Sequence, residues 1–247
     1  MGGQDFTQAQ TLGQLSNASN ATLLVELDGQ KYIYKPQSGE RQLWDFPTGT
    51  LYQRERAAFV ISELLGWGLI PETVIAEGAY GIGSFQKWVE AETQLVDIFA
   101  PDEVPDRWLQ ITRGVTEDGS QVVLAHANSA DLLKLAVFDA ITNNADRKAG
   151  HILTNSDQQV WAIDHGVTFN VEPKLRTVLW GWLGQAIPDA LIEDLKNLEG
   201  NLATSEISQL ISEDEFLELK YRISELIETK TFPSPNPNWP AVPWPIF

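Results

Sequence analysis

The most informative part of the chain is a pair of short segments, in which residues 144–153 read NADRKAGHIL and residues 162–166 read AIDHG. A polar loop carries Asp146, His151 follows five residues later, and Asp164 lies eighteen residues after Asp146, shortly before a glycine. Phosphoryl transfer needs a carboxylate that orients the acceptor hydroxyl and ligands that hold a divalent metal on the transferred phosphate. A tight hairpin between the two acids would direct both into one cleft.

The sequence upstream predicts a small β-rich unit that contains one helix. Asp28 and Gly29 form a typical hairpin turn between two strand-like runs. A run with helical apolar spacing ends at Gly66, which is a typical helix stop. The predicted strands are residues 22–27, 31–35, 73–76 and 83–89, and the predicted helix is residues 51–65. The first 90 residues therefore predict the order β-β-α-β-β.

The downstream sequence predicts a mainly helical unit. Residues 91–129 are acidic and are predicted to be irregular. Residues 232–247 hold six of the 13 prolines, which excludes a helix or a central strand there. The predicted helices are residues 131–141, 190–198, 205–211 and 213–229, and the hairpin strands are residues 151–154 and 160–163.

The segments quoted first resemble the catalytic loop and the metal-binding Asp-Phe-Gly segment of the protein-kinase-like superfamily. Residues 32–36, YIYKP, resemble the strand that carries the ATP-pairing lysine. The pattern is closest to the phosphatidylinositol 3-/4-kinase-like and HipA-like branches and to small bacterial proteins of that kind. The resemblance implies an α+β, two-lobed fold, with an N-lobe over residues 1–90 and a C-lobe over residues 91–247.

The resemblance also implies roles for five charged residues. Lys35 would contact the α- and β-phosphates of ATP, and Glu55, twenty residues further on, would hold Lys35. Asp146 would orient the acceptor hydroxyl, Lys148 would face the γ-phosphate, and Asp164 would bind Mg²⁺ or Mn²⁺.

The remaining part of the implied nucleotide site lies in two loops and departs from the family pattern. Gln86 and Val89 fall where the hinge between the lobes should contact adenine. Ser19 and Asn20 fall in the phosphate-covering loop, which lacks the G-x-G-x-x-G pattern but could hold phosphate through backbone N–H groups. His151 stands where the family has Asn, and imidazole suits Mn²⁺ better than Mg²⁺. Either Asp164 is the main metal ligand or Mn²⁺ replaces Mg²⁺.

Composition limits the partners of this chain. The 17 Lys and Arg residues against 34 Asp and Glu give a net charge of −17, which disfavours nucleic acid and anionic membranes. There is no Cys, so disulfides and thiol chemistry are excluded. No signal peptide and no stretch of about 20 apolar residues is visible, so a cytoplasmic protein without a membrane span is expected.

Three functions remain open at this stage. The first is an ATP-dependent kinase whose acceptor is a protein or a small molecule. The second is a pseudokinase that binds nucleotide or a partner without turnover, which the His at position 151 and the unusual phosphate loop would suit. The third is a metal-dependent hydrolase that uses His126, His151, Asp164 and His165, although these residues do not form a helical ligand pair.

Overall fold

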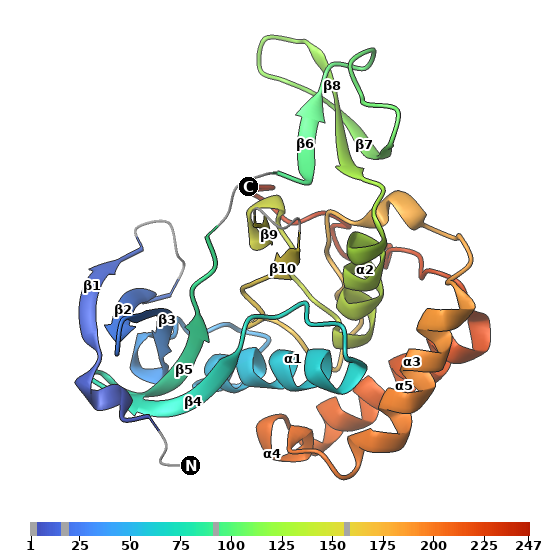
Figure 1. Ribbon diagram of the computed structural model, residues 1–247. Helices are drawn as coiled ribbons and strands as arrows, with labels where there is room; N and C mark the ends of the chain where they lie inside the picture. Colours follow the sequence, from blue (N-terminus) through green and yellow to red (C-terminus); the bar gives the residue numbers. More distant parts are fainter. Residues whose placement is uncertain (1–3, 16–19, 91–93, 156–158) are drawn as a thin grey trace.

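A computed structural model of the chain has an α+β fold with a β-rich N-terminal lobe and a mainly helical C-terminal lobe (Figure 1). The structure describes residues 4–15, 20–90, 94–155 and 159–247. The predicted fold class is confirmed, whereas the lobe boundary at residue 90 stays a prediction.

The N-terminal lobe is built on a five-stranded antiparallel sheet of order β1-β2-β3-β5-β4. Asp28 and Gly29 both adopt positive φ and close the β2–β3 hairpin, as their sequence predicts. On one face, Tyr34 stacks on Phe85 with ring centroids 4.2 Å apart. The strands are β1 (Gln10–Gln14), β2 (Leu23–Leu27), β3 (Gln30–Pro36), β4 (Thr73–Gly78) and β5 (Gly81–Lys87). The four predicted strands agree with β2 to β5, whereas β1 was not predicted.

Helix α1 (Leu51–Leu65) connects the sheet to the helical lobe. Its buried apolar residues include Ala57, Ala58 and Ile61, which join the core of the helical lobe. Its first turns also bury Arg54, whose side chain is 1% exposed. Helix α1 ends at Gly66, which adopts the left-handed conformation that glycine tolerates without strain.

The C-terminal lobe surrounds one apolar core that contains Phe138, Leu195 and Leu219. Helix α4 is shorter than the predicted helix at residues 205–211. The elements of this lobe are α2 (Ala130–Thr142), β9 (Ile152–Thr154), β10 (Val160–Ala162), α3 (Asp189–Leu202), α4 (Ile207–Leu210) and α5 (Glu213–Thr229). Short 3₁₀ helices cover Phe6–Gln8, Gln37–Gly39, Ala149–His151 and Trp180–Trp182.

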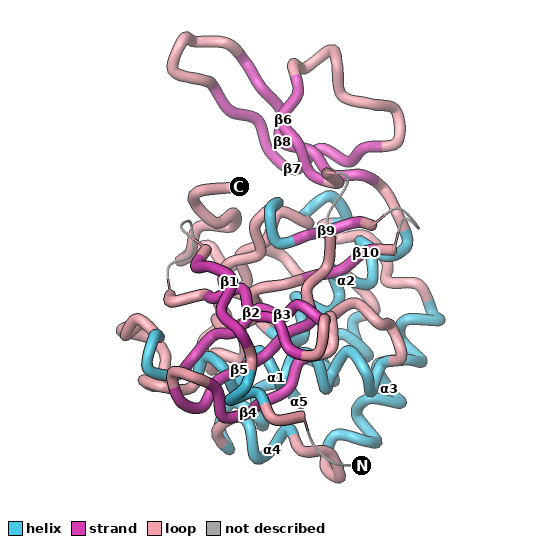
Figure 2. Tube along the Cα trace, turned by 60° about the vertical axis from the view of Figure 1, so that its left-hand side comes forward, coloured by secondary structure: helices cyan, strands magenta, loops and turns pink. Residues whose placement is uncertain are grey.

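The irregular structure predicted for residues 91–129 is wrong. Strands β6 (Val96–Phe99), β7 (Trp108–Val115) and β8 (Gln121–Ala127) form an antiparallel sheet of order β6-β8-β7 that projects from the molecule (Figures 1 and 2). Most of β7 is exposed, and its exposed positions include polar residues on both faces of the strand. The alternation of apolar and polar residues that normally indicates a strand is therefore interrupted. The available signal was the apolar run of β8, which follows a turn at Gly119.

The proline-rich C-terminal segment has neither helix nor strand in residues 232–247, as predicted, and runs back over the loop of residues 143–150. The carbonyl of Ala241 accepts a hydrogen bond from the N–H of Thr177 at 3.1 Å, and the carbonyl of Ile246 accepts one from Ala149 at 2.8 Å. The end of the chain is therefore held next to the segment that carries Asp146.

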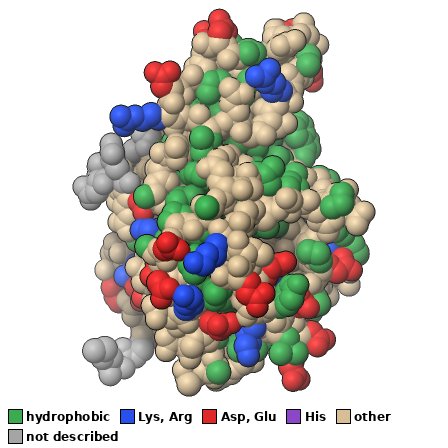
Figure 3. Space-filling model, turned by 90° about the vertical axis from the view of Figure 1, so that its right-hand side faces the viewer, with side chains coloured by type: hydrophobic (Ala, Val, Ile, Leu, Met, Phe, Trp, Pro, Cys, Tyr) green, Lys and Arg blue, Asp and Glu red, His purple; other side chains and the backbone are tan. Residues whose placement is uncertain are grey.

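The surface agrees with the acidic composition. On the face in Figure 3, acidic side chains are spread over the lower part, and Lys and Arg side chains lie singly among them. In the described ranges, the protein has no helix with the length and apolar character needed to cross a bilayer.

Removing Arg54 alone is expected to destabilise the fold, because Arg54 pairs with a buried carboxylate across the two lobes. Its guanidinium contacts Oε1 of Glu215 on α5 at 2.5 Å and the carbonyl of Thr168 at 2.7 Å. Arg54→Ala would leave the carboxylate of Glu215 buried without its cation, so the free energy of unfolding should fall by about 3–5 kcal/mol. Urea unfolding measures this loss.

Two further variants test whether the loss of stability comes from the buried ion pair rather than from the removal of any arginine. Arg113→Ala removes an exposed arginine of β7 and should change the free energy of unfolding by less than about 0.5 kcal/mol. Replacing Arg54 and Glu215 together with Met should recover much of the loss, because no unpaired charge remains buried. Equal stability of Arg54→Ala and the wild-type protein would contradict a joining role for this ion pair.

Candidate active site

Three charged side chains from distant parts of the chain meet between the lobes. Nζ of Lys35, at the end of β3, lies 2.5 Å from Oε1 of Glu55 on α1 and 2.8 Å from Oδ1 of Asp164. The side chain of Glu55 is 3% exposed, whereas that of Asp164 is 49% exposed. Lys35 is therefore fixed on its buried side and faces an open carboxylate on the other.

The mutual attraction of these groups sets their ionisation. Burial alone would lower the pKa of Lys35, but the charges of Asp164 and Glu55 more than compensate and raise it above its ordinary value. Burial would raise the pKa of Asp164, but Lys35 and His151 hold it well below its usual range. Lys35 is therefore a cation and Asp164 an anion at neutral pH.

The backbone around Asp164 is shaped to present this carboxylate. Asp164 has φ of 61°, in the left-handed region that is sparsely populated by residues other than glycine. The next N–H, of His165, donates to Oε2 of Glu55 at 2.9 Å. Glu55 thus uses one oxygen for Lys35 and the other for the loop that carries Asp164.

A buried ion pair joins this loop to the loop of residues 143–150, which carries Asp146. Arg147 and Asp139 are both fully buried, and Nε and Nη2 of Arg147 donate to the Asp139 carboxylate at 2.9–3.2 Å. The same guanidinium donates to the carbonyl of Ile163 at 2.9 Å and to Nε2 of His165 at 2.6 Å. The sequence analysis did not predict this network. Asp139 could have indicated it, because an acidic residue within the apolar helix predicted at residues 131–141 needs a buried partner.

Asp146 and Lys148 lie together on the open side of the loop of residues 143–150. Oδ2 of Asp146 is 3.3 Å from Nζ of Lys148. Burial raises the pKa of Asp146, and Lys148 opposes part of this shift. Asp146 lines a cavity of about 330 Å³ together with Lys35, Glu55 and Asp164. These four predicted residues are therefore brought into one cleft.

His151 lies on the other side of Asp164. Its Nε2 is 3.4 Å from Oδ2 of Asp164, and its Nδ1 accepts a hydrogen bond from the N–H of Lys148 at 3.5 Å. Burial lowers the pKa of His151 to about 4, so the ring is neutral at pH 7. Because Nδ1 is the acceptor, the ring proton belongs on Nε2, where it faces Asp164.

A second cavity, of about 400 Å³, shares Lys35, His151 and Asp164 with this region and extends to the end of β5. Val89 and Gln86 line it. Gln86 is 7% exposed, and its side-chain amide already donates to Oγ1 of Thr73 at 2.9 Å. Val89, at the predicted hinge, therefore borders a cavity that could hold a ligand. The side-chain amide of Gln86 is already hydrogen-bonded to Thr73.

The phosphate-covering loop is described only in part. Ser19 lies outside the described residues. Asn20 lines the cavity that contains Asp146, and its side-chain oxygen accepts a hydrogen bond from the N–H of Arg41 at 2.7 Å. The proposed role of this loop stays a prediction.

The metal-dependent hydrolase lacks its ligand set. His126 is buried on β8, where its Nε2 accepts a hydrogen bond from the N–H of Gly181 at 3.1 Å and its ring packs against Trp182. His165 is also buried, and its Nε2 accepts a hydrogen bond from the guanidinium of Arg147. Over the described ranges, no group of three or more His, Asp or Glu side chains is placed to hold a metal by itself.

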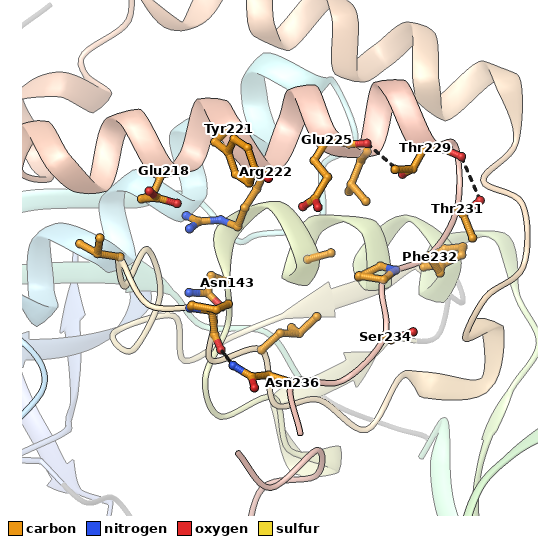
Figure 4. Close-up of a pocket in the computed structure, with 16 residues that line it drawn as sticks. Asn143, Glu218, Tyr221, Arg222, Glu225, Thr229, Thr231, Phe232, Ser234 and Asn236 are labelled. Carbon is orange, nitrogen blue, oxygen red and sulfur yellow. Dashed lines mark hydrogen bonds between the residues drawn. The ribbon is translucent and has the colours of Figure 1, made fainter. Parts of the chain in front are cut away.

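A third cavity, of about 480 Å³, lies on the helical lobe (Figure 4). It is lined by α5 and by residues 231–236, with Arg222 between Glu218 and Glu225 along the helix. The guanidinium of Arg222 donates to the carbonyls of Ile141 and Asn170. None of the predicted site residues lines this cavity, so it is separate from the candidate active site.

The chain has a kinase-like fold. A crystal structure of the Helicobacter pylori proinflammatory kinase CtkA is similar with a TM-score of 0.52, at 12% identity, over 92% of this chain and 94% of the other. At that identity the likeness shows the fold alone. It does not distinguish the phosphatidylinositol 3-/4-kinase-like and HipA-like branches, which stay predictions.

The family is shown by sequence. Protein Rv2133c of Mycobacterium tuberculosis is 41% identical over 254 aligned positions, which cover 96% of this chain and 91% of the relative. The chain belongs to the same family as this protein. No protein-family model matches the sequence.

Arg147→Lys tests whether the buried network positions the Asp164 loop. Lys keeps the charge but cannot bind Asp139, the Ile163 carbonyl and His165 at once. We expect the amide of His165 to exchange with deuterium at least tenfold faster, because its contact with Glu55 depends on the position of the loop. Mass-spectrometric hydrogen exchange measures this. Exchange at the α5 amides serves as the control, and a uniform acceleration there would indicate general destabilisation instead.

Proposed function

We propose that this protein is an ATP-dependent phosphotransferase. The observation that supports this most directly is the position of the Lys35 ammonium between Glu55 and Asp164, in the cleft that also contains Asp146. A lysine held in this way presents a fixed positive charge to a phosphate. An adjacent exposed carboxylate can bind a metal, and a second carboxylate can orient a hydroxyl.

Each nucleotide group has a suitable partner. Adenine would enter the 400 Å³ cavity at Val89, which has no backbone hydrogen bond within the described part of the chain. Lys35, at the junction of the two cavities, would contact the α- and β-phosphates. Asn20 would lie beside the phosphates, and Lys148 would face the γ-phosphate near Asp146.

The donor set at Asp164 fits a divalent metal. An exposed carboxylate oxygen is a ligand that Mg²⁺ and Mn²⁺ both accept, and phosphate oxygens and water would complete the coordination. When bound, the metal would neutralise charge on the phosphates. Asp164 is the principal ligand in this proposal. His151 would hold Asp164 through its Nε2 proton in the tautomer described above, and would need the other tautomer to bind a metal directly.

Asp146 would act at the acceptor. Its carboxylate would accept a hydrogen bond from the acceptor hydroxyl and take the proton as the oxygen attacks the γ-phosphorus. Its oxygens have Lys148 as their neighbour on one side and the open cavity on the other. An activity that consumes ATP fits the cytoplasmic location expected from the sequence.

A nucleotide-binding pseudokinase is the second candidate. The observation that favours it is the contact of His151 with Oδ2 of Asp164 while Lys35 contacts Oδ1, so that both metal-facing oxygens have partners. Such a protein would bind nucleotide and release no ADP.

Two alanine variants separate catalysis from binding. Asp164→Ala should reduce both metal-dependent nucleotide affinity and turnover, because the phosphate charge loses its metal. Asp146→Ala should reduce turnover by about 10²-fold or more, the usual scale for a positioned base, with nucleotide affinity unchanged. Calorimetric titration with a non-hydrolysable ATP analogue and an ADP-release assay measure the two effects. Binding of the analogue without ADP release under any metal and with any cell extract would make the protein a pseudokinase.

The role of His151 is tested by metal preference. If His151 were a direct ligand, His151→Asn should move the preference from Mn²⁺ towards Mg²⁺. We expect instead that the ratio of activity with the two metals stays within about threefold, because Asp164 provides the coordinating oxygen. A change in the Mn²⁺ to Mg²⁺ ratio of tenfold or more would place His151 among the ligands. ADP release at matched metal concentrations provides the readout.

A further inference from the structure

Arg176 is a partly buried arginine without a side-chain partner. Its guanidinium makes no hydrogen bond or ion pair within the residues that the structure describes, and its Nε is buried and unsatisfied. Arg54 and Arg147, by contrast, are each paired with a carboxylate. A buried donor without an acceptor costs free energy, so its retention needs an explanation.

Arg176 is held next to the proposed catalytic carboxylate. Its backbone N–H donates to the carbonyl of Asn144 at 2.9 Å, and its carbonyl accepts from the N–H of Arg147 at 3.0 Å. These contacts place it beside Asn144 and Arg147, which lie on either side of Asp146 in the loop, and it lines the same cavity. Its charge also opposes the burial that raises the pKa of Asp146. Arg176 therefore faces the part of the cleft where an acceptor would lie.

A second arginine in the cavity belongs to the nucleotide side. Arg41 also lines the cavity and has no side-chain partner in the described residues. Its backbone binds Asn20, next to the predicted phosphate-covering loop. Arg41 is thus placed for the triphosphate, whereas Arg176 extends from the opposite lobe beside Asp146. The two arginines have separate tasks in a cleft that already contains Lys35.

The size and walls of the cavity favour a small acceptor. Its volume of about 330 Å³ is near the lower end of the range for small-molecule sites. The N-terminal lobe contributes Trp44 and the C-terminal segment contributes Trp244, which are 81% and 82% exposed. The hydrogen bond from Ala149 to Ile246 fixes the C-terminal segment in this position. Trp44 already stacks on Trp239 and has the ammonium of Lys174 over its ring, so Trp244 is the indole that could pack against the carbon skeleton of an acceptor, while Arg176 supplies the charge for an anionic group.

We propose that the phosphate acceptor is a small molecule that carries both a hydroxyl and an anionic group, and that Arg176 binds this anionic group. This inference rests on the proposed phosphotransferase function. The acceptor oxygen forms a bond to the γ-phosphorus, the bond from that phosphorus to the oxygen of ADP breaks, and the hydroxyl proton passes to Asp146. The guanidinium fork of Arg176 matches a phosphate or a carboxylate in two parallel hydrogen bonds.

A binding experiment tests the anion site without turnover. Inorganic phosphate is titrated calorimetrically into protein that is saturated with Mg²⁺ and a non-hydrolysable ATP analogue, so that the triphosphate position is filled. The wild-type protein should bind phosphate, and Arg176→Ala should weaken that binding at least tenfold. Arg176→Lys should retain part of it, because the charge remains without the fork. Arg113→Ala, on exposed β7, is the matched control and should bind phosphate as the wild type does.

A turnover experiment distinguishes the sources of the anion. ADP release is compared with glycerol 3-phosphate, glycerate and glycerol as acceptors. Either anionic compound should be preferred at least tenfold over glycerol, and Arg176→Ala should remove the preference while the KM for ATP stays within about twofold. The compound that is preferred decides between phosphate and carboxylate.

The outcomes separate this inference from the proposed function. Equal phosphate binding by Arg176→Ala and the wild type, or phosphorylation of protein hydroxyls alone, would overturn the anionic acceptor while leaving the kinase intact. Failure of the ATP analogue to bind would overturn the proposed function. In that case, phosphate titrated into the nucleotide-free protein still tests Arg176, and loss of binding in Arg176→Ala would keep the anion site.

Discussion

The contact of Lys35 with both Glu55 and Asp164 is the interaction on which the rest of the site depends. Bringing Lys35 and Glu55 out of water costs several kcal/mol per ion, and only close contact with each other and with the more exposed Asp164 offsets that cost. The group has a net charge of −1, so it cannot by itself attract a triphosphate. A divalent cation held by Asp164, as proposed, would make the local charge favourable and would allow a carboxylate to lie where phosphates are expected to bind.

The surrounding protein fixes this group by pairing other charges in its interior. Arg54 joins α1 to α5, and the pair of Arg147 with Asp139 joins the two loops that carry Asp146 and Asp164. Apolar residues could fill the same volumes at equal or lower cost, but they would not fix directions as hydrogen bonds do. The buried pairs thus determine geometry more than stability, and each lies within a few residues of a group assigned to chemistry.

The sequence predicts correctly those helices and strands whose apolar residues are spaced so that they match the face that is buried in the structure. The β2–β3 hairpin follows from Asp28 and Gly29, and α1 follows from its apolar spacing and Gly66. Strand β7 was missed because its exposed face removes the alternation. The meeting of Lys35 with Asp164 was inferred from family resemblance, since no local pattern specifies a contact across 129 residues. No sequence pattern indicates a role for Arg176. Its role is inferred only from the structure, in which its guanidinium has no partner among the described residues.

The acidic surface and the basic side chains inside the cleft act at different distances. A net charge of −17 repels anions in general, but at physiological salt charges separated by more than about 8 Å are largely screened. Within the cleft, Lys35, Lys148 and Arg176 lie closer than that to the groups they would bind. The acidic surface therefore slows the encounter with any anion, while the cleft selects those small enough to enter it. A large polyanion such as nucleic acid or an anionic membrane would contact mainly the surface, so this charge distribution disfavours such partners while leaving the cleft open to the proposed nucleotide.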